Sequence, residues 1–185
     1  MKKFEPLEKA LRIESGRLLL RPIEKEDTDL VLLFRNADYV KNNFFYRKTI
    51  TKKEHLRFFE EKCEKGLVFY FLVYEKESQM PIGCVYMQHY DEKKDSIETG
   101  LFFSEKAPKK KGYATEAYSL MIEYAFKVLD VSCLEARVIS SNNASLMLHK
   151  RCGYQEVQRT VETVVPTGEE VEAVTLELSR AGYIR

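Results

Sequence analysis

The stretch 109–117, which reads Lys-Lys-Lys-Gly-Tyr-Ala-Thr-Glu-Ala, carries the residue types best suited to chemistry in this chain of 185 residues. A strand-like run precedes it, and a strong helical pattern follows over 114–129. A glycine at a helix start leaves backbone N–H groups free and lets a ligand approach closely. The helix dipole and the three lysines add positive charge at the same point. The stretch predicts an anion site suited to a diphosphate, the alternative being a solvated lysine turn.

Other common site patterns are absent from the sequence. The basic loop matches neither the ATP-type phosphate loop nor the dinucleotide-binding glycine pattern. Four cysteines have spacings that match no zinc pattern, so no metal is expected: Cys63, Cys84, Cys133 and Cys152. The net charge of +1 and the pI of about 7.6 do not favour nucleic acid as a partner. Without an apolar leader or a membrane-spanning run, we expect a reduced, cytoplasmic protein with no membrane partner.

Local patterns indicate the elements that must position this loop. Helices are expected from apolar spacing and capping residues at 28–37, 51–65, 114–129 and 143–151. Strands are expected from β-branched and aromatic runs at 17–23, 68–75, 82–90, 96–104, 133–139, 154–165 and 171–179. Asp27 is the expected cap of the first helix. Residues 1–16 predict a short arm, and without a dividing linker we expect one domain over residues 1–185.

In the expected order, strands joined by hairpins are interrupted by helices. This order predicts a mixed α/β fold in which helices flank a mostly antiparallel central sheet. The strand–helix–strand unit over 97–139 is the exception, because a helical crossover allows two parallel strands to lie side by side.

Three stretches, in order and properly spaced, resemble the GNAT N-acetyltransferases, and within them the RimJ/RimL branch of ribosomal-protein N-terminal acetyltransferases. They are Arg-Leu-Leu-Leu-Arg-Pro (17–22) with Glu26-Asp27 and Arg35-Asn36, Ile-Glu-Thr-Gly (97–100) with Gly-Tyr-Ala-Thr-Glu-Ala (112–117), and Ser-Asn-Asn-Ala-Ser (141–145) with Lys-Arg-Cys-Gly-Tyr (150–154). The resemblance covers roughly residues 17 to 180 and implies the GNAT fold.

The resemblance also implies an enzyme that moves an acetyl group from acetyl-CoA to a primary amine by direct attack in a ternary complex. The residues expected to hold acetyl-CoA are Leu101, Phe102, Phe103, Lys109, Lys110, Lys111, Gly112, Tyr113, Ala114, Thr115, Asn142 and Ser145. The loop departs from the family, with Lys109 where Arg or Gln is usual and Lys110 in place of a frequent glycine. For Asn142 and Ser145 the alternative is a capping role in the short helix.

Two side chains are candidates for proton transfer. An alkyl amine with a pKa near 10 is almost fully protonated at neutral pH, so a base is useful. Glu98 is the candidate base because it lies on the acetyl-CoA strand before the cofactor contacts. His149 occupies the position, four residues before Gly153, where many GNATs carry a tyrosine, and its imidazole could protonate the leaving thiolate. The alternatives are a surface carboxylate and a helix-surface histidine.

The amine acceptor stays open between several classes. The branch resemblance implies a protein N-terminus, other features resemble sugar-nucleotide acetyltransferases, and a polyamine or antibiotic amine is the third class. A non-catalytic acyl-CoA sensor is the rival outside enzymes. In the family, an interhelical loop borders the acceptor, so the expected acceptor contacts are Arg35, Phe44, Phe45 and Tyr46, with inward packing of the aromatic side chains as the alternative. The C-terminal hairpin implies a homodimer by family analogy alone.

Overall fold

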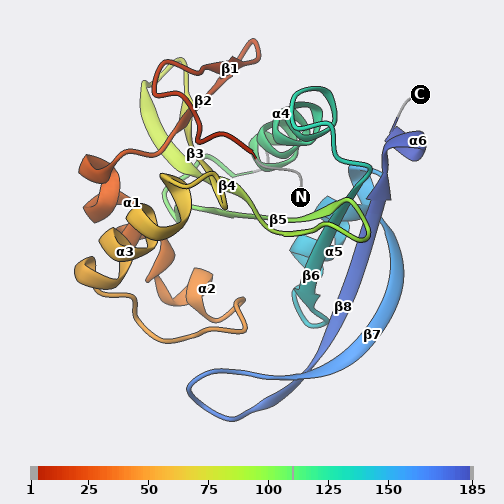
Figure 1. The fold of residues 1–185 in the computed structure, drawn as a ribbon. Helices are drawn as coiled ribbons and strands as arrows, with labels where there is room; N and C mark the ends of the chain where they lie inside the picture. Colours follow the sequence, from red (N-terminus) through yellow and green to blue (C-terminus); the bar gives the residue numbers. More distant parts are fainter. Residues whose placement is uncertain (1–3, 110, 184–185) are drawn as a thin grey trace.

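The computed structural model describes residues 4–109 and 111–183, and within them eight strands form one sheet in the order β1-β2-β3-β4-β5-β6-β8-β7 (Figure 1). The strands are β1 (Ile13–Glu14), β2 (Leu18–Pro22), β3 (Phe69–Glu75), β4 (Met80–Asp91), β5 (Ser96–Phe103), β6 (Cys133–Ile139), β7 (Gln155–Thr163) and β8 (Glu170–Ser179). The helices are α1 (Thr28–Arg35), α2 (Asp38–Lys41), α3 (Lys52–Phe58), α4 (Tyr113–Lys127), α5 (Asn143–Arg151) and α6 (Arg180–Tyr183).

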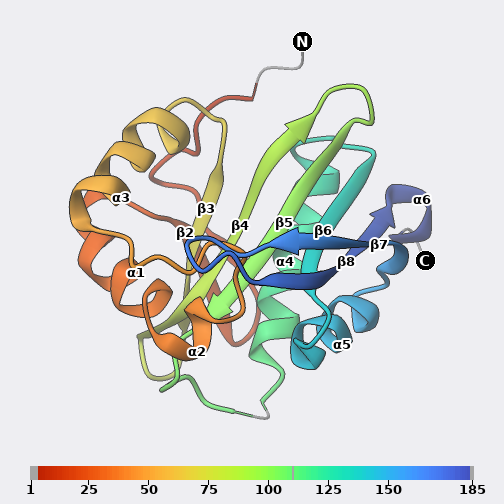
Figure 2. The ribbon, with the colours of Figure 1, turned by 90° about the horizontal axis from the view of Figure 1, so that it is seen from below.

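Pairing in the sheet confirms the expected mixed fold. Neighbouring strands pair antiparallel except β5 and β6, which run parallel and are joined by α4. The crossover over 97–139 therefore does bring two parallel strands side by side. The helices lie on both faces: α4 and α5 cover one, and α1, α2 and α3 cover the other (Figure 2).

Strand β5 contributes to both hydrophobic cores because successive side chains point to opposite faces. Ile97 belongs to the core under α4, and Phe102 belongs to the core under α1 and α2. The side chains of Glu98 and Phe102 therefore share the face of α1–α3, with Gly100 between them. Thr99 points to the face of α4 and α5, so this one strand presents polar side chains to both faces of the sheet.

Two local expectations were wrong, and some short elements were missed. Asp27 does not cap α1; its carboxylate accepts from the Glu24 N–H at 2.8 Å and pairs with the Arg21 guanidinium at 2.7 Å. The partly buried ion pair thus takes the oxygens that a cap would use. The second helix ends at Phe58 and continues as a π turn, η2 (Phe59–Cys63), rather than running to Lys65. The helix α6 was not expected at all.

The described part of the N-terminal arm joins the body of the protein. Its strand β1 pairs with β2, and the ring of Phe4 makes edge contacts with Phe69 at 5.5 Å and Tyr90 at 4.9 Å between centroids. Within the described chain, no helix is both long and apolar enough to cross a membrane.

Candidate active site

The parallel strands β5 and β6 separate after three residue pairs. Their register pairs are Ser96↔Cys133, Ile97↔Leu134 and Glu98↔Glu135, and both strands continue beyond these pairs. The hydroxyl of Thr99 then donates to the main-chain oxygen of Glu135 at 2.9 Å. From there to Phe103, the β5 backbone groups that face β6 have no partner on that strand. A splay of this kind offers main-chain donors and acceptors to an extended ligand.

The predicted diphosphate loop lies at the start of α4. Gly112 is the N-cap residue with φ 75°, a left-handed conformation that favours glycine. The first turn of a helix has no internal acceptor for its N–H groups, which leaves those of Tyr113, Ala114 and Thr115 for an anion. Lys109, Lys111 and Gly112 are exposed, whereas Lys110 lies outside the described residues. The side chain of Tyr113 is buried and donates to Glu75 at 2.5 Å, so only its backbone faces the loop.

An arginine from the N-terminal part of the chain holds this loop in place. The Arg17 guanidinium donates to the Lys111 carbonyl at 3.0 Å, forms an ion pair with Glu116 and lies 4.8 Å from the centroid of the Tyr113 ring. Ser15 donates to the same Glu116 carboxylate at 2.5 Å. The geometry of the anion site therefore depends on residues about 95 positions earlier in the chain.

Glu98 lies at the last pair before the splay, on the face of α1–α3. One carboxylate oxygen accepts from the Gln88 amide at 2.9 Å, and the other lies 3.5 Å from His89 Nδ1 and 3.7 Å from Arg137 Nε. Its side chain is 22% exposed, so solvent reaches it. The site provides a partly buried carboxylate, held by polar neighbours, next to unpaired β5 backbone.

His149 lies on the opposite face, buried within the protein. Its Nδ1 is 2.7 Å from the Ser145 carbonyl, which only accepts, so Nδ1 carries the proton. Its Nε2 therefore accepts from the Tyr118 hydroxyl at 2.8 Å. Burial lowers the pKa of His149 to about 4, against a weaker opposing effect of the Ser145 carbonyl. At neutral pH the ring is uncharged and has both nitrogens occupied, an arrangement that does not favour the predicted acid role.

The hydrogen bond from Tyr118 connects His149 to Thr99, at the point where β5 separates from β6. The Tyr118 hydroxyl is 2.6 Å from Thr99 Oγ1, which is 3.0 Å from the Tyr154 hydroxyl. This Thr99–His149 network, comprising Thr99, Tyr118, His149 and Tyr154, joins β5, α4, α5 and the start of β7. Its members are all at most 4% exposed. The network fixes both helices against the point where β5 leaves β6.

Asn142 and Ser145 take the capping role at the N-terminus of α5. The Asn142 side chain accepts from the Ser145 N–H at 3.1 Å. Contact with a cofactor stays a prediction for both residues. The cap places the first turn of α5 near the network, because Ser145 also supplies the carbonyl that His149 binds.

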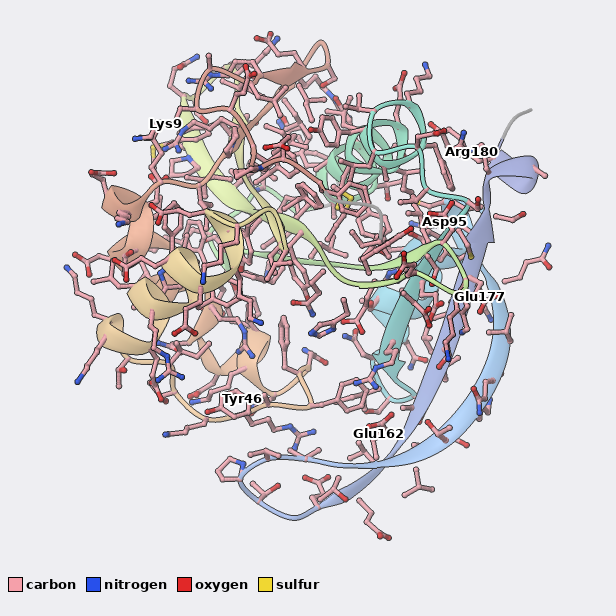
Figure 3. The ribbon with its side chains drawn as sticks, in the orientation of Figure 1. Lys9, Tyr46, Asp95, Glu162, Glu177 and Arg180 are labelled. Atoms are coloured by element: carbon pink, nitrogen blue, oxygen red, sulfur yellow. The ribbon has the colours of Figure 1, made fainter. Side chains whose placement is uncertain are left out.

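The aromatic loop between α2 and α3 reaches the turn of the β7–β8 hairpin. The Val165 N–H donates to the Phe45 carbonyl at 2.8 Å, and the Arg47 N–H donates to the Val165 carbonyl at 2.6 Å. Figure 3 shows Tyr46 on this loop and Glu162 on β7, both on the same side of β5. The loop and the hairpin together border the face that carries Glu98.

The aromatic residues of this loop take different positions. Phe44 packs inward, with its ring 6.0 Å from that of Phe102, and Tyr46 is 42% exposed. The Phe45 ring lies 5.2 Å from the Arg137 guanidinium, which also reaches Glu162 at 3.4 Å. Phe45 therefore stands beside the partners of Glu98, whereas Phe44 belongs to the core.

Arg35 is buried at the end of α1, with only 8% of its surface exposed. Its Nη2 donates to the Tyr46 carbonyl at 2.9 Å, and its guanidinium carbon lies 3.7 Å from the centroid of the Phe44 ring. Its Nη1 is buried and has no hydrogen-bond partner among the described residues. The structure thus places Arg35 beside the aromatic loop with Nη1 free to donate, and its contact with the acceptor stays a prediction.

Sequence reasoning missed Tyr86 of β4. Tyr86 pairs in register with Gly100, and a Cβ on Gly100 would lie 2.3 Å from the end of the Tyr86 ring. Glycine inside a strand often marks such a close approach, so Gly100 was the available signal. Thr99, Tyr118 and Tyr154 were also missed, because nothing in their local sequence distinguishes them from ordinary core residues.

A cavity of about 390 Å³ lies elsewhere, between the N-terminal arm and η2. Its lining includes Leu7, Ile23, Phe59 and Tyr70, and no residue of β5, β6, α4 or α5. Among the described residues, no group of three or more His, Cys, Asp or Glu side chains is placed to hold a metal ion.

Known proteins resemble this chain in sequence and in fold. The family model for the acetyltransferase (GNAT) domain matches residues 17–155. The probable N-acetyltransferase YjcK of Bacillus subtilis is 26% identical over 159 residues, which cover 78% of this chain and 83% of that protein.

The similar solved structures differ in the acceptors that their descriptions name. Spermidine N-acetyltransferase from Vibrio cholerae, in complex with CoA and spermine, has a TM-score of 0.83 at 18% identity and covers 92% of this chain and 100% of its own. FdhC, described as a nucleotide-linked sugar GNAT, has a TM-score of 0.74 at 22% identity over 94% and 92% of the two chains. A putative ribosomal-protein-serine acetyltransferase from Vibrio cholerae has 0.74 at 21% identity over 92% and 98%. At these identities the likeness concerns the fold alone.

Proposed function

The chain belongs to the GNAT family and is an N-acetyltransferase, and from this premise we propose that it transfers the acetyl group of acetyl-CoA directly to a primary amine in a ternary complex. The observation that carries the proposal is the separation of β5 from β6 after Glu98. The separation leaves main-chain groups of β5 beside the Glu98 carboxylate, near the first turn of α4, which suits a diphosphate. We propose that residues 1–185 act as one domain.

The cofactor is proposed to lie along the splay. Backbone groups of Leu101, Phe102 and Phe103 would meet the pantetheine arm, and the loop 109–115 would meet the diphosphate. One main-chain N–H of β5 would donate to the acetyl oxygen as negative charge develops there. A single donor of this kind contributes roughly 2.7–4 kcal/mol in other acyl-transfer enzymes.

Replacing Arg17 by alanine is expected to weaken acetyl-CoA binding severalfold. Arg17 is the residue that fixes the Lys111 carbonyl and Glu116 at the start of α4, so its loss lets the free N–H groups move relative to one another. Isothermal titration with acetyl-CoA measures the change. Arg12→Ala is the matched control, since among the described residues Arg12 bonds only to neighbouring arm carbonyls, at 2.7 Å. Equal affinities in the two variants would show that the loop needs no such support.

Glu98 is proposed to accept the proton of the amine, directly or through a water molecule. It is accessible, and it lies on the face bordered by the aromatic loop, where the acceptor would arrive. His149 stays a candidate acid for the leaving thiolate. To act so it would have to take up a proton and release the Tyr118 hydroxyl, and its present contacts support a role in positioning β5 instead.

The acceptor class is tested by CoA release from acetyl-CoA against a panel of amines. The panel holds peptides with free N-termini, amino-sugar nucleotides, polyamines and aminoglycosides. We expect turnover with at least one class. Clear binding of acetyl-CoA without turnover of any amine would instead favour the acyl-CoA sensor, and absence of binding would contradict the proposal. The RimJ/RimL branch and the homodimer stay predictions, the latter checked by light scattering.

A further inference from the structure

Arg35 is a buried cation without a counter-charge. It forms no ion pair with a carboxylate of the described chain, and its Nη1 has no hydrogen-bond partner there. A guanidinium does not lose its proton in a protein, so the positive charge persists. Burying an unpaired ion is unfavourable, and an arriving anion would offset that cost.

Two phenols stand next to this guanidinium. The rings of Tyr70 and Tyr86 are stacked with their centroids 5.4 Å apart. Both rings lie against Phe102, at 6.3 and 6.5 Å between centroids, and Phe102 also contacts Phe44, the ring under the Arg35 guanidinium. Neither hydroxyl makes a hydrogen bond to another described residue. The guanidinium Nη1 and the two O–H groups are therefore available as donors, a set that suits an oxyanion.

Tyr86 connects this donor group with the proposed base. Its ring end occupies the space over Gly100, two residues after Glu98 on the same strand. Burial raises the pKa of Tyr86, the charge of Glu98 raises it further, and the charge of Arg35 opposes both. Tyr86 therefore connects the two groups, with its ring end over Gly100 and its ring in the aromatic cluster that packs against Arg35.

Three carboxylates on this face each lie near a cation. Glu98 and Glu162 share Arg137, at 3.7 and 3.4 Å, and Glu135 is 3.3 Å from Lys94. Arg35 is the cation left without such a partner in the described part of this face. A buried cation without a carboxylate partner favours an anionic group on the acceptor over a polycation at this point.

We propose that Arg35, together with the hydroxyls of Tyr70 and Tyr86, forms a subsite for an oxyanion, a carboxylate or a phosphate, carried by the acceptor amine. The inference rests on the proposed function, because Glu98 receives the amino group of the same molecule. It separates amines that carry an acidic group from polyamines, which carry none.

The kinetic experiment compares the best acceptor from the amine panel with an analogue that lacks its oxyanion. We expect wild-type kcat/KM to fall at least about tenfold for the analogue. In Arg35→Gln this preference should shrink to less than about twofold, mainly through KM of the acidic acceptor, and Arg35→Lys should restore it in part. Arg57→Gln is the control with the same charge change, since Arg57 is exposed on α3. A best acceptor without an oxyanion, or an undiminished preference in Arg35→Gln, would overturn the inference.

A binding experiment does not depend on turnover or on variants. In CoA-saturated wild-type protein with labelled arginine, the Arg35 side-chain N–H signals are followed by NMR during titration with inorganic phosphate and, separately, with acetate. Saturable shifts at Arg35, absent at Arg57, support the subsite and show which oxyanion it prefers. If neither anion shifts Arg35, the inference fails even when amines are acetylated. If anions bind but no amine is turned over, the proposed function fails instead.

Discussion

Replacing Glu98 by glutamine is expected to lower kcat for amine acetylation by roughly 10²–10⁴-fold, the usual contribution of a positioned base. Glutamine keeps the size of the side chain and its contact with Gln88, but it cannot take up the proton of the amine. Because the fold and the diphosphate loop are untouched, the Kd for acetyl-CoA should stay the same. Steady-state CoA release and isothermal titration separate the two effects.

The pH dependence of the Glu98→Gln variant tests whether Glu98 acts as the base. Without a base, only the small fraction of amine that is already neutral can react. The residual rate should therefore rise about tenfold per pH unit up to the amine pKa near 10. Glu177→Gln is the matched control, because Glu177 lies on the same face two strands away. If Glu98→Gln retained full kcat at every pH, Glu98 would be an ordinary strand carboxylate.

His149→Phe is expected to lower the free energy of unfolding by about 1–3 kcal/mol at neutral pH. The phenyl ring fills the space but leaves the Tyr118 hydroxyl and the Ser145 carbonyl without their present partner. Urea unfolding followed by circular dichroism measures the loss. His89→Phe, at a side chain that is 71% exposed, should change stability far less. Equal losses in the two variants would show that the Thr99–His149 network adds nothing to stability.

The same histidine predicts a loss of stability in acid. Burial holds the pKa of His149 at about 4 in the folded protein, against 6.5 for an unperturbed ring. Between these values the unfolded chain binds the proton and the folded protein does not, so stability falls as pH falls. The loss between pH 7 and pH 5 is about 2 kcal/mol. The pKa of buried His55 is also lowered by burial, so its effect has the same sign.

His149→Phe should abolish its own share of this acid sensitivity and leave that of His55. Unfolding curves for the wild type and the variant at pH 7 and pH 5 give the difference. A wild type equally stable at both pH values would contradict the buried, neutral ring. The variant also tests the acid role, since a side chain that only positions β5 can be lost with little change in the pH profile of kcat.

The sequence by itself determined the elements and the anion loop, because the signals for both are local. The bounds of β6 and α5 follow from residues within one or two turns, including the Asn142 cap and the glycine at 153. Thr51 and Glu54 form the expected capping box in α3 for the same reason. Gly112 at a helix start predicts free N–H groups without knowledge of any distant residue.

Only the tertiary structure decided which side chains meet. Asp27 does not act as a cap because a strand residue, Arg21, pairs with it. The Tyr118 hydroxyl that His149 accepts from comes from a position 31 residues earlier. Phe44 and Phe45 are neighbours in a chain pattern that treats them alike, yet one packs inward and the other faces Arg137. Burial and partner choice depend on what the fold packs against each side chain, and a local pattern contains no such information. The buried Arg35 guanidinium, with its free Nη1, likewise follows from the packing around it and not from its local sequence.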